Sequence, residues 1–415
     1  MKPFLLILLL SIFSSVTAQD IKNGQIISGH TDTVQSKILG EKRAVWIHLP
    51  EGAGSPENAM RYPVVYLLDG AEFFSPVTGM ITYLSEKNGN MICPDMIVVG
   101  ITNTDRTRDL TPTYGKLDFT DKPTDDFKTS GGGEKFTAFI EKELIPHIDS
   151  IYPAAPFRML VGHSFGGLTA VNILINHTNL FNAYTIIDPS MWWDGKKLLK
   201  QAQEVLKQKD FSGRSVFLGI ANTMPDDMDT LHVRHDTSGV NNHIRSILKL
   251  KDVFQQNTAN GLKWDYKYYK DDNHNSSPLI AEYDGFRFLF DYYKLPNAID
   301  AKLYDATAKI DVGAVLLAHY AAISKHMGYQ VLPPQSILHD MGYNFMEINL
   351  PDRALAVFEM NIKYYPKSYL VYDSMGDYYD MKKDKEQAIM YYKKSIALKD
   401  NLETRNKLNK VSLQK

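Results

Sequence analysis

The feature that most constrains the fold of this chain is an alternation of two hydrophobic patterns between residues 24 and 294. Short runs rich in β-branched and aromatic residues, bordered by glycine or proline, are typical of buried strands. Longer stretches between them carry apolar residues at helical spacing. Strands that alternate with helices predict an α/β domain, with a mainly parallel sheet covered on both faces. We expect strands over 43–50, 62–70, 96–101, 157–162, 182–188, 215–220 and 264–269, and helices over 134–152, 166–177, 243–257 and 279–293.

A second pattern begins beyond Pro296, where the strand-like runs stop and the sequence reads as helical. Residues here repeat at a period of 34, the length of a tetratricopeptide repeat. Small residues in such repeats let the two helices of a pair approach closely. We therefore expect a small all-α domain over 335–415, with two tetratricopeptide-like repeats and a capping helix. A helical linker over 297–334 should pack beneath the repeats and against the first domain, which spans 19–296. The matched pairs are Leu338 with Tyr372, Gly342 with Gly376, Phe345 with Tyr379, Ala354 with Ala388, and Phe358 with Tyr392.

The first residues of the chain have the pattern of a cleavable signal peptide. Lys2 precedes an apolar run over 4–13, and Val16 and Ala18 are small residues at the positions that cleavage requires. About ten apolar residues are too few to cross a bilayer, which needs roughly twenty. We expect a signal peptide over 1–18, export to the periplasm or the medium, and no membrane span.

The bulk composition excludes some partners. A formal net charge of −2 leaves no basic surface for nucleic acid. Cys93 is the only cysteine, so no disulfide can form within the chain. It lies just before an apolar strand-like run, and we interpret it as a structural residue.

The pentapeptide Gly162-His163-Ser164-Phe165-Gly166 follows one predicted strand and opens a predicted helix. A serine on a sharp turn between strand and helix is typical of a nucleophile elbow, where glycines avoid clashes at the crossing. The sequence therefore predicts that Ser164 is a nucleophile. The backbone N–H of Phe165 would then face the oxyanion of the reaction, aided by the start of the following helix.

The base in such a site comes after the nucleophile in the chain, in a loop that follows a late strand. His274 fits, because it lies in a polar loop between the strand over 264–269 and the helix that follows. Most of the other histidines precede Ser164 or belong to the helical tail. His232 and His235 are spaced like a metal pair, but no further ligand motif accompanies them, and we expect no metal.

The acid of the triad should follow the strand over 215–220, and the loop after it offers Asp226, Asp227 and Asp229. A carboxylate there would orient the imidazole of His274 and stabilise its cationic form. The sequence does not choose among the three, although the distance from the strand end favours Asp226, with Asp229 next. A second oxyanion donor is expected in the turn after the strand over 62–70, and the N–H of Ala71 is the candidate.

Several separated motifs together resemble the esterase family of α/β hydrolases that includes S-formylglutathione hydrolase, feruloyl esterases and ferric-siderophore esterases. The resemblance covers roughly residues 24–295 and implies an ester-cleaving serine enzyme without a metal or organic cofactor. Matched position by position, Ser164 corresponds to the nucleophile and His274 to the base, whereas the loop over 222–230 departs from the family pattern. The tryptophan pair Trp192-Trp193 in DPSMWWD most closely resembles the siderophore-esterase branch. Both residues are candidates to line the substrate pocket. The motifs are YLLDGAEFF (66–74), GITNTDRTRDLTPTY (100–114), ELIPHID (143–149), GHSFGGL (162–168), DPSMWWD (188–194) and YKDDNHNSSP (269–278).

Together these features predict an exported serine esterase that forms an acyl-enzyme. Its substrate would be a catecholate siderophore, a feruloyl or acetyl ester on a polysaccharide, or another small ester. One alternative is an acyltransferase of the same fold, in which an alcohol accepts the acyl group. The other is a peptide-binding adaptor that uses the helical repeats, beside an α/β domain without activity. A protein partner bound through the repeats is compatible with an active esterase as well as with the adaptor.

Overall fold

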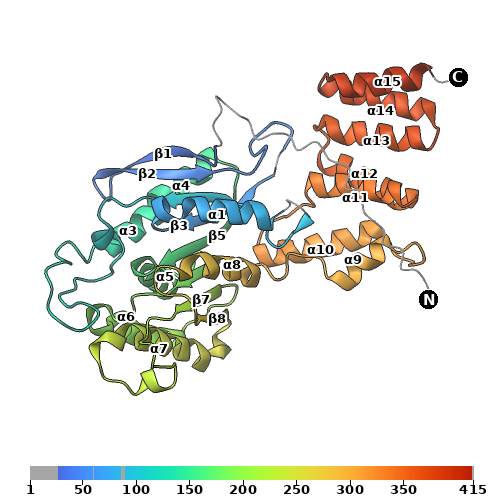
Figure 1. Cartoon of the computed structure of the whole chain (residues 1–415). Coiled ribbons are helices and arrows are strands. Elements are labelled where there is room, and N and C mark those ends of the chain that lie inside the picture. The colour runs from blue at the N-terminus through green and yellow to red at the C-terminus, as the bar shows by residue number, and fades with distance from the viewer. Residues whose placement is uncertain (1–26, 59, 86–88, 414–415) are drawn as a thin grey trace, which may run out of the picture.

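The computed structural model describes residues 27–58, 60–85 and 89–413 (Figure 1). The predicted signal peptide over 1–18 lies outside the described residues. None of the described helices combines the length and the apolar character that a bilayer span requires.

The centre of the larger domain is an eight-stranded sheet with the order β1-β2-β4-β3-β5-β6-β7-β8 (Figure 1). Only β2 runs antiparallel to its neighbours, and the remaining strands share one direction. The predicted α/β class with a mainly parallel sheet is thus confirmed. The strands are β1 (His30–Ser36), β2 (Glu41–His48), β3 (Tyr62–Leu67), β4 (Ile97–Ile101), β5 (Ala154–His163), β6 (Ala183–Ile187), β7 (Ser215–Ala221) and β8 (Lys263–Tyr269).

Helices cover both faces of this sheet, because its central strands are apolar on both sides. In β3, Val64 and Tyr66 belong to the apolar cluster on one face, and Val65 and Leu67 to the cluster on the other. This division follows from the two-residue period of a strand. The longer helices of the domain are α1 (Gly70–Leu84), α3 (Gly133–Phe139), α4 (Ile145–Ile151), α5 (Phe165–Asn176), α6 (Trp193–Gln208), α7 (Asn242–Gln256) and α8 (Ser277–Leu289).

The stretch predicted as one helix over 134–152 contains a π turn over Ile140–Leu144 that joins α3 to α4. Pro146 lies in the first turn of α4. Because proline has no backbone N–H, it cannot donate the usual helical hydrogen bond at this position. The wider turn just before it is consistent with that missing bond.

The C-terminal region is all-helical and extends from the sheet domain as a stack of helices (Figure 1). Leu316 and Tyr320 of α10 share one apolar cluster with Phe290 after α8 and Phe345 of α11, so α10 links the stack to the sheet domain. The helices are α9 (Asn297–Tyr304), α10 (Val312–Met327), α11 (Gln335–Glu347), α12 (Pro351–Tyr364), α13 (Tyr369–Met381), α14 (Lys385–Leu398) and α15 (Leu402–Leu413).

Two glycines allow close packing within successive helix pairs of the stack. A Cβ atom on Gly342 of α11 would lie 2.2 Å from the ring of Phe358 in α12. A Cβ atom on Gly376 of α13 would lie 2.4 Å from the ring of Tyr392 in α14. The same contact therefore recurs in two helix pairs, at the spacing of the sequence repeat.

Candidate active site

Ser164 occupies a sharp turn between β5 and α5, as its motif predicts. Its backbone has φ 58° and ψ −114°, a conformation that residues with a side chain rarely adopt. The surrounding glycines make the turn possible, since a Cβ atom on Gly162 would lie 2.3 Å from the carbonyl oxygen of Gly166. Two backbone hydrogen bonds hold Ser164 in this turn. Its N–H donates to the carbonyl of Ile187 at 3.0 Å, and its carbonyl accepts from the N–H of Ser190 at 3.1 Å.

Two helix N-termini meet near this turn. Phe165 is the first residue of α5, and Ala71 is the second residue of α1. The N–H groups of a first helical turn have no carbonyl partner within the helix and are suited to bind an anion. The turn before α1 packs against α5, because a Cβ atom on Gly166 would lie 3.4 Å from Leu68. The two N–H groups predicted to bind the oxyanion thus belong to helix starts that are neighbours.

Asp69 fixes the turn that precedes Ala71. It is buried, adopts a left-handed backbone with φ 53°, and is the residue before α1. Its carboxylate accepts from Arg106 at 2.7 and 2.8 Å and from the Asn103 amide at 2.6 Å. The Arg106 guanidinium also lies 5.4 Å from the centre of the Phe165 ring. Arg106 therefore ties the start of α1 to the start of α5.

His274 lies in the loop between β8 and α8 and contacts a buried carboxylate, that of Asp188. Its Nδ1 is 2.6 Å from Asp188 Oδ2. Asp188 directly follows β6, and its Oδ1 accepts from the N–H of Ala221 at 3.0 Å. Burial alone would raise the pKa of Asp188, but the charges and hydrogen bonds of His243 and His274 outweigh it and hold that pKa below its usual range. Asp188 therefore stays ionised and can accept from the imidazole of His274.

Neither Asp226 nor Asp229 is the carboxylate that contacts His274 in the described structure, contrary to the sequence-based expectation. Both are exposed in the loop after β7. Asp229 accepts from the backbone N–H and the Nδ1 of His232, each at 2.8 Å, and so closes the turn that follows it. The loop after β7 thus keeps its carboxylates in solvent, whereas the shorter turn after β6 directs Asp188 beneath His274.

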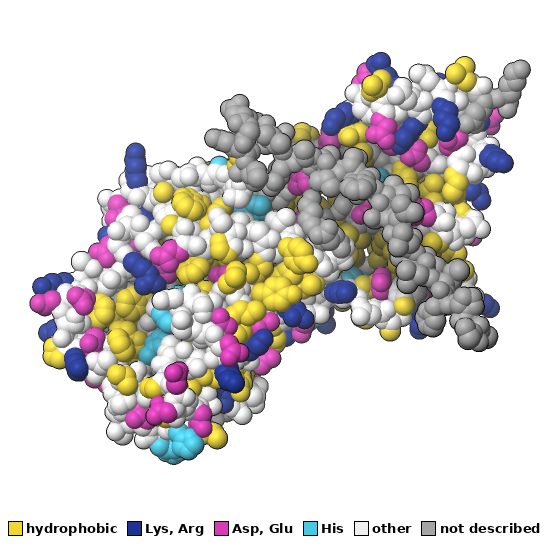
Figure 2. Space-filling view, in the orientation of Figure 1, with side chains coloured by type: hydrophobic (Ala, Val, Ile, Leu, Met, Phe, Trp, Pro, Cys, Tyr) yellow, Lys and Arg dark blue, Asp and Glu magenta, His cyan; other side chains and the backbone are white. Residues whose placement is uncertain are grey.

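Two further histidines flank His274. The ring of His163 lies 4.4 Å from that of His274, and the ring of His243 lies 5.1 Å from it on another side. Burial, with a contribution from the charge of His274, lowers the pKa of His163 to about 4, so it is neutral at physiological pH. At the end of the sheet domain away from the C-terminal helices, Figure 2 shows histidine side chains beside apolar ones.

Trp192 and Trp193 are both buried but differ in their surroundings. Trp193 donates from Nε1 to the carbonyl of Thr113 at 3.1 Å, and its ring leaves no room for a Cβ atom on Gly115. This tryptophan supports the long loop beside the site. Trp192 instead lies 6.4 Å, between ring centres, from the half-exposed ring of Phe119 and 6.2 Å from that of Phe165. Of the pair, Trp192 is the one whose ring lies beside this exposed phenylalanine.

One group of side chains in the described part of the chain has the makeup of a metal site, namely Asp188, His243 and His274. Both histidine nitrogens approach the same carboxylate oxygen, at 2.6 and 2.8 Å. Ligands that surround a zinc ion tetrahedrally at about 2.0–2.1 Å lie more than about 3 Å apart. The observed distances are those of N–H donors to a shared acceptor.

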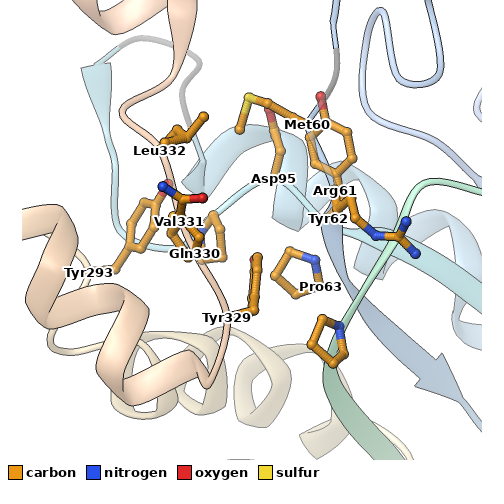
Figure 3. Close-up of a pocket in the computed structure, with 12 residues that line it drawn as sticks. Met60, Arg61, Tyr62, Pro63, Asp95, Tyr293, Tyr329, Gln330, Val331 and Leu332 are labelled. Atoms are coloured by element: carbon orange, nitrogen blue, oxygen red, sulfur yellow. The ribbon is translucent and has the colours of Figure 1, made fainter. Parts of the chain in front are cut away.

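A cavity of about 330 Å³ lies at the opposite edge of the sheet (Figure 3). Tyr62 at the start of β3 lines one side, and Tyr293 after α8 and Tyr329 after α10 line the other. Ser164 follows the end of β5, whereas Pro156 at the cavity is close to the beginning of that strand. The cavity is therefore separate from the site around Ser164.

The sheet order, the turn at Ser164 and the His274–Asp188 pair are those of an α/β hydrolase. The model of the family described as "Putative esterase" matches residues 36–282, more than half of the chain, and the chain belongs to this family. A crystal structure of an IroE-like serine hydrolase from Shewanella oneidensis is 31% identical, with a TM-score of 0.68. That comparison covers 81% of this chain and 99% of the other.

Curated relatives agree with this family. The ferri-bacillibactin esterase BesA of Bacillus subtilis is 27% identical over 180 residues, which are 41% of this chain and 62% of the relative. The siderophore enterobactin esterase of Emericella nidulans is 27% identical over 187 residues, 41% of this chain and 57% of the relative. The chain thus spans less than two thirds of the length of either relative.

The sequence motifs predicted site roles for Ser164, Phe165, Ala71 and His274. They did not predict roles for Asp188 and His243. The motif DPSMWWD contains the missing acid, which is the last residue of the strand predicted over 182–188. The carboxyl ends of parallel strands lie at one edge of the sheet, so the position of Asp188 at a strand end made it a possible acid for His274. His243 opens a predicted helix and carried no comparable pattern.

Proposed function

We propose that this protein is a serine-dependent carboxylic ester hydrolase. Ser164 Oγ attacks the ester carbonyl and passes its proton to Nε2 of His274, while Asp188 holds the imidazole through Nδ1. The N–H groups of Phe165 and Ala71 stabilise the negative oxygen of the tetrahedral intermediate. His274 then protonates the departing alcohol, which leaves an acyl group on Ser164. Water, deprotonated by the same histidine, releases the acid and restores the serine.

The observation that carries this proposal is the contact of 2.6 Å between His274 Nδ1 and a fully buried Asp188, beside a serine in a strained turn. A buried carboxylate needs partners, and a strained backbone is retained only where its surroundings enforce it. The proposed acid is thus Asp188, in place of the Asp226 or Asp229 suggested by the sequence.

Hydrolysis of p-nitrophenyl acetate and butyrate tests the proposal, together with labelling by a fluorophosphonate probe. The wild type should turn over both esters and accept one label per chain. Ser164→Ala should lose both properties while it stays folded. A folded wild-type sample without turnover and without label would refute the assignment.

We further propose that the substrate is an ester of a catecholate siderophore. The relatives named above as siderophore esterases support this substrate class. The exposed ring of Phe119, which lies beside Trp192, also supports it, because it offers an aromatic surface to an aryl group. Comparison of kcat/KM for a ferric tris-catecholate lactone, a feruloyl ester and p-nitrophenyl butyrate tests the choice. A feruloyl ester as the best substrate of the three would exclude the siderophore.

We infer that α11–α15 form two tetratricopeptide-like repeats with a capping helix. The recurrent contacts of Gly342 with Phe358 and of Gly376 with Tyr392 support this inference. The capping role of α15 is supported by Lys407, which pairs with both Asp373 and Asp377 of α13. Export of the protein, with cleavage after Ala18, remains our proposal from the sequence, and the N-terminal sequence of the mature protein tests it.

A further inference from the structure

His243 is a buried histidine that the reaction described above does not use. It is the second residue of α7, and its side chain is about one-tenth exposed. Its Nε2 lies 2.8 Å from Oδ2 of Asp188, the same oxygen that His274 contacts. An ionised carboxylate only accepts hydrogen bonds, so His243 is the donor in this pair.

The Asp188 carboxylate is thus held from three elements of the fold. His243 approaches from α7, His274 from the loop after β8, and the N–H of Ala221 from the end of β7. His274 must change its protonation state and its hydrogen bonds during the reaction, whereas the proposed mechanism assigns no proton transfer to His243 or to the N–H of Ala221. These two donors therefore fix the carboxylate independently of the step that His274 performs.

The residue before His243 links the same helix turn to the loop that carries Phe119. The Asn242 amide donates to the carbonyl of Phe119 at 3.1 Å and to Asp121 at 3.2 Å. Phe119 is the half-exposed ring that lies beside Trp192. The first turn of α7 thus contacts both the buried acid and the loop that carries Phe119 and Asp121.

We propose that His243 is a positioning residue for the ester hydrolysis, which holds the Asp188 carboxylate in the orientation that His274 requires. This inference rests on the proposed function and deepens it. Without the Nε2–H donor, the carboxylate is held only by the backbone N–H of Ala221 and by His274 itself, whose hydrogen bond must change during the reaction. Loss of the donor should therefore slow the chemical step more than it weakens substrate binding.

The test uses the mature full-length protein and p-nitrophenyl butyrate. His243→Leu replaces the donor with an apolar side chain of similar size. His243→Gln instead keeps an N–H near the position of Nε2. The matched control is His235→Leu, which changes an exposed histidine before α7. We expect kcat of His243→Leu to fall about tenfold or more with KM within about twofold, and kcat of His243→Gln to recover to within about threefold of the wild type. The control should match the wild type.

Equal kcat values in His243→Leu and the wild type would overturn the proposal. So would a folded His243→Gln that is as slow as His243→Leu, because the imidazole would then act only by packing. If the His243 variants fail to fold, a proton NMR measurement on the wild type still tests the proposal. Among its low-field imidazole N–H resonances, the wild type should show one assigned to His243 and one assigned to His274, and the absence of the His243 resonance would refute the shared contact. This resonance does not depend on turnover, so it separates a failure of the inference from an enzyme that proves inactive.

Discussion

His163, the histidine beside Ser164, should make the stability of the sheet domain depend on pH. It is buried, its ring lies 4.4 Å from that of His274, and it packs against the Phe73 ring in a T-shaped arrangement. Its Nε2 is buried without a hydrogen-bond partner among the described residues. Burial, with help from the charge of His274, lowers its pKa from the ordinary 6.5 to about 4 in the folded protein.

The sign and size of the effect follow from these two pKa values. Between pH 6.5 and pH 4 the unfolded chain binds a proton at His163 that the folded protein does not, so the free energy of unfolding falls as the pH falls. At 1.36 kcal/mol per pH unit, the loss between pH 7.5 and pH 4.5 is about 2.5 kcal/mol. The stabilising contribution is fully present above pH 6.5 and has been lost below pH 4.

Urea unfolding at pH 7.5, 6.5, 5.5 and 4.5, for the wild type and His163→Phe, measures this contribution. Phenylalanine keeps a ring of similar size that does not titrate, and it leaves no Nε2 buried. Tryptophan fluorescence is the appropriate probe, because all four tryptophans (Trp46, Trp192, Trp193 and Trp264) belong to the sheet domain. Other histidines titrate in both proteins, so the quantity of interest is the difference between the two curves.

The wild type should lose about 2.5 kcal/mol more than His163→Phe between pH 7.5 and pH 4.5. Parallel curves would refute the reasoning, because His163 would then titrate alike in the folded and unfolded states. A wild type that loses less stability than the variant would contradict the sign of the argument, and His163 would have to be charged in the folded protein.

Three further predictions concern other parts of the chain. Asp188→Ala should lower kcat for p-nitrophenyl butyrate by roughly 10³–10⁴-fold, whereas Asp229→Ala should remain within about twofold of the wild type; the reverse order would return the acid to the loop after β7. Gly376→Ala should destabilise the helical region by about 1–2 kcal/mol in thermal unfolding followed by circular dichroism, since the new methyl group meets the buried ring of Tyr392; unchanged or increased stability would show that this ring can move. Cys93, which is buried and whose pKa is raised by that burial, should react with a thiol reagent only after urea unfolds the protein, and rapid reaction in the folded state would place it at the surface.

Local pattern was sufficient for most of the fold. The expected strands all appear, and the central ones are short apolar runs that the sheet buries on both faces. β8 is mostly exposed, and its aromatic residues carried the prediction. β1 escaped prediction, since only Val34 and Ser36 are buried in it and its sequence shows no apolar run. The π turn before Pro146 escaped as well, because periodicity does not reveal how a helix accommodates a proline.

The sequence by itself determined the features that depend on near neighbours in the chain. The turn at Ser164 follows from glycines two residues away on either side, and the helix pairs of the C-terminal region follow from a repeat of small and aromatic residues. The position of His274 after a late strand also follows from chain order. In each case the residues that define the feature lie within one or two adjacent elements.

Only the tertiary structure decided which carboxylate meets His274, and that a second histidine shares it. Asp188 lies 86 residues before His274 and 55 before His243. These residues meet because β6, β7 and β8 are neighbours in the sheet and end at the same edge. The loop after β7 holds its aspartates in solvent, whereas the left-handed backbone of Asp188, with φ 40°, begins the turn that carries its side chain into the buried space between α7 and the His274 loop. Burial and side-chain direction selected the acid, and neither is encoded in the spacing of residues along the chain.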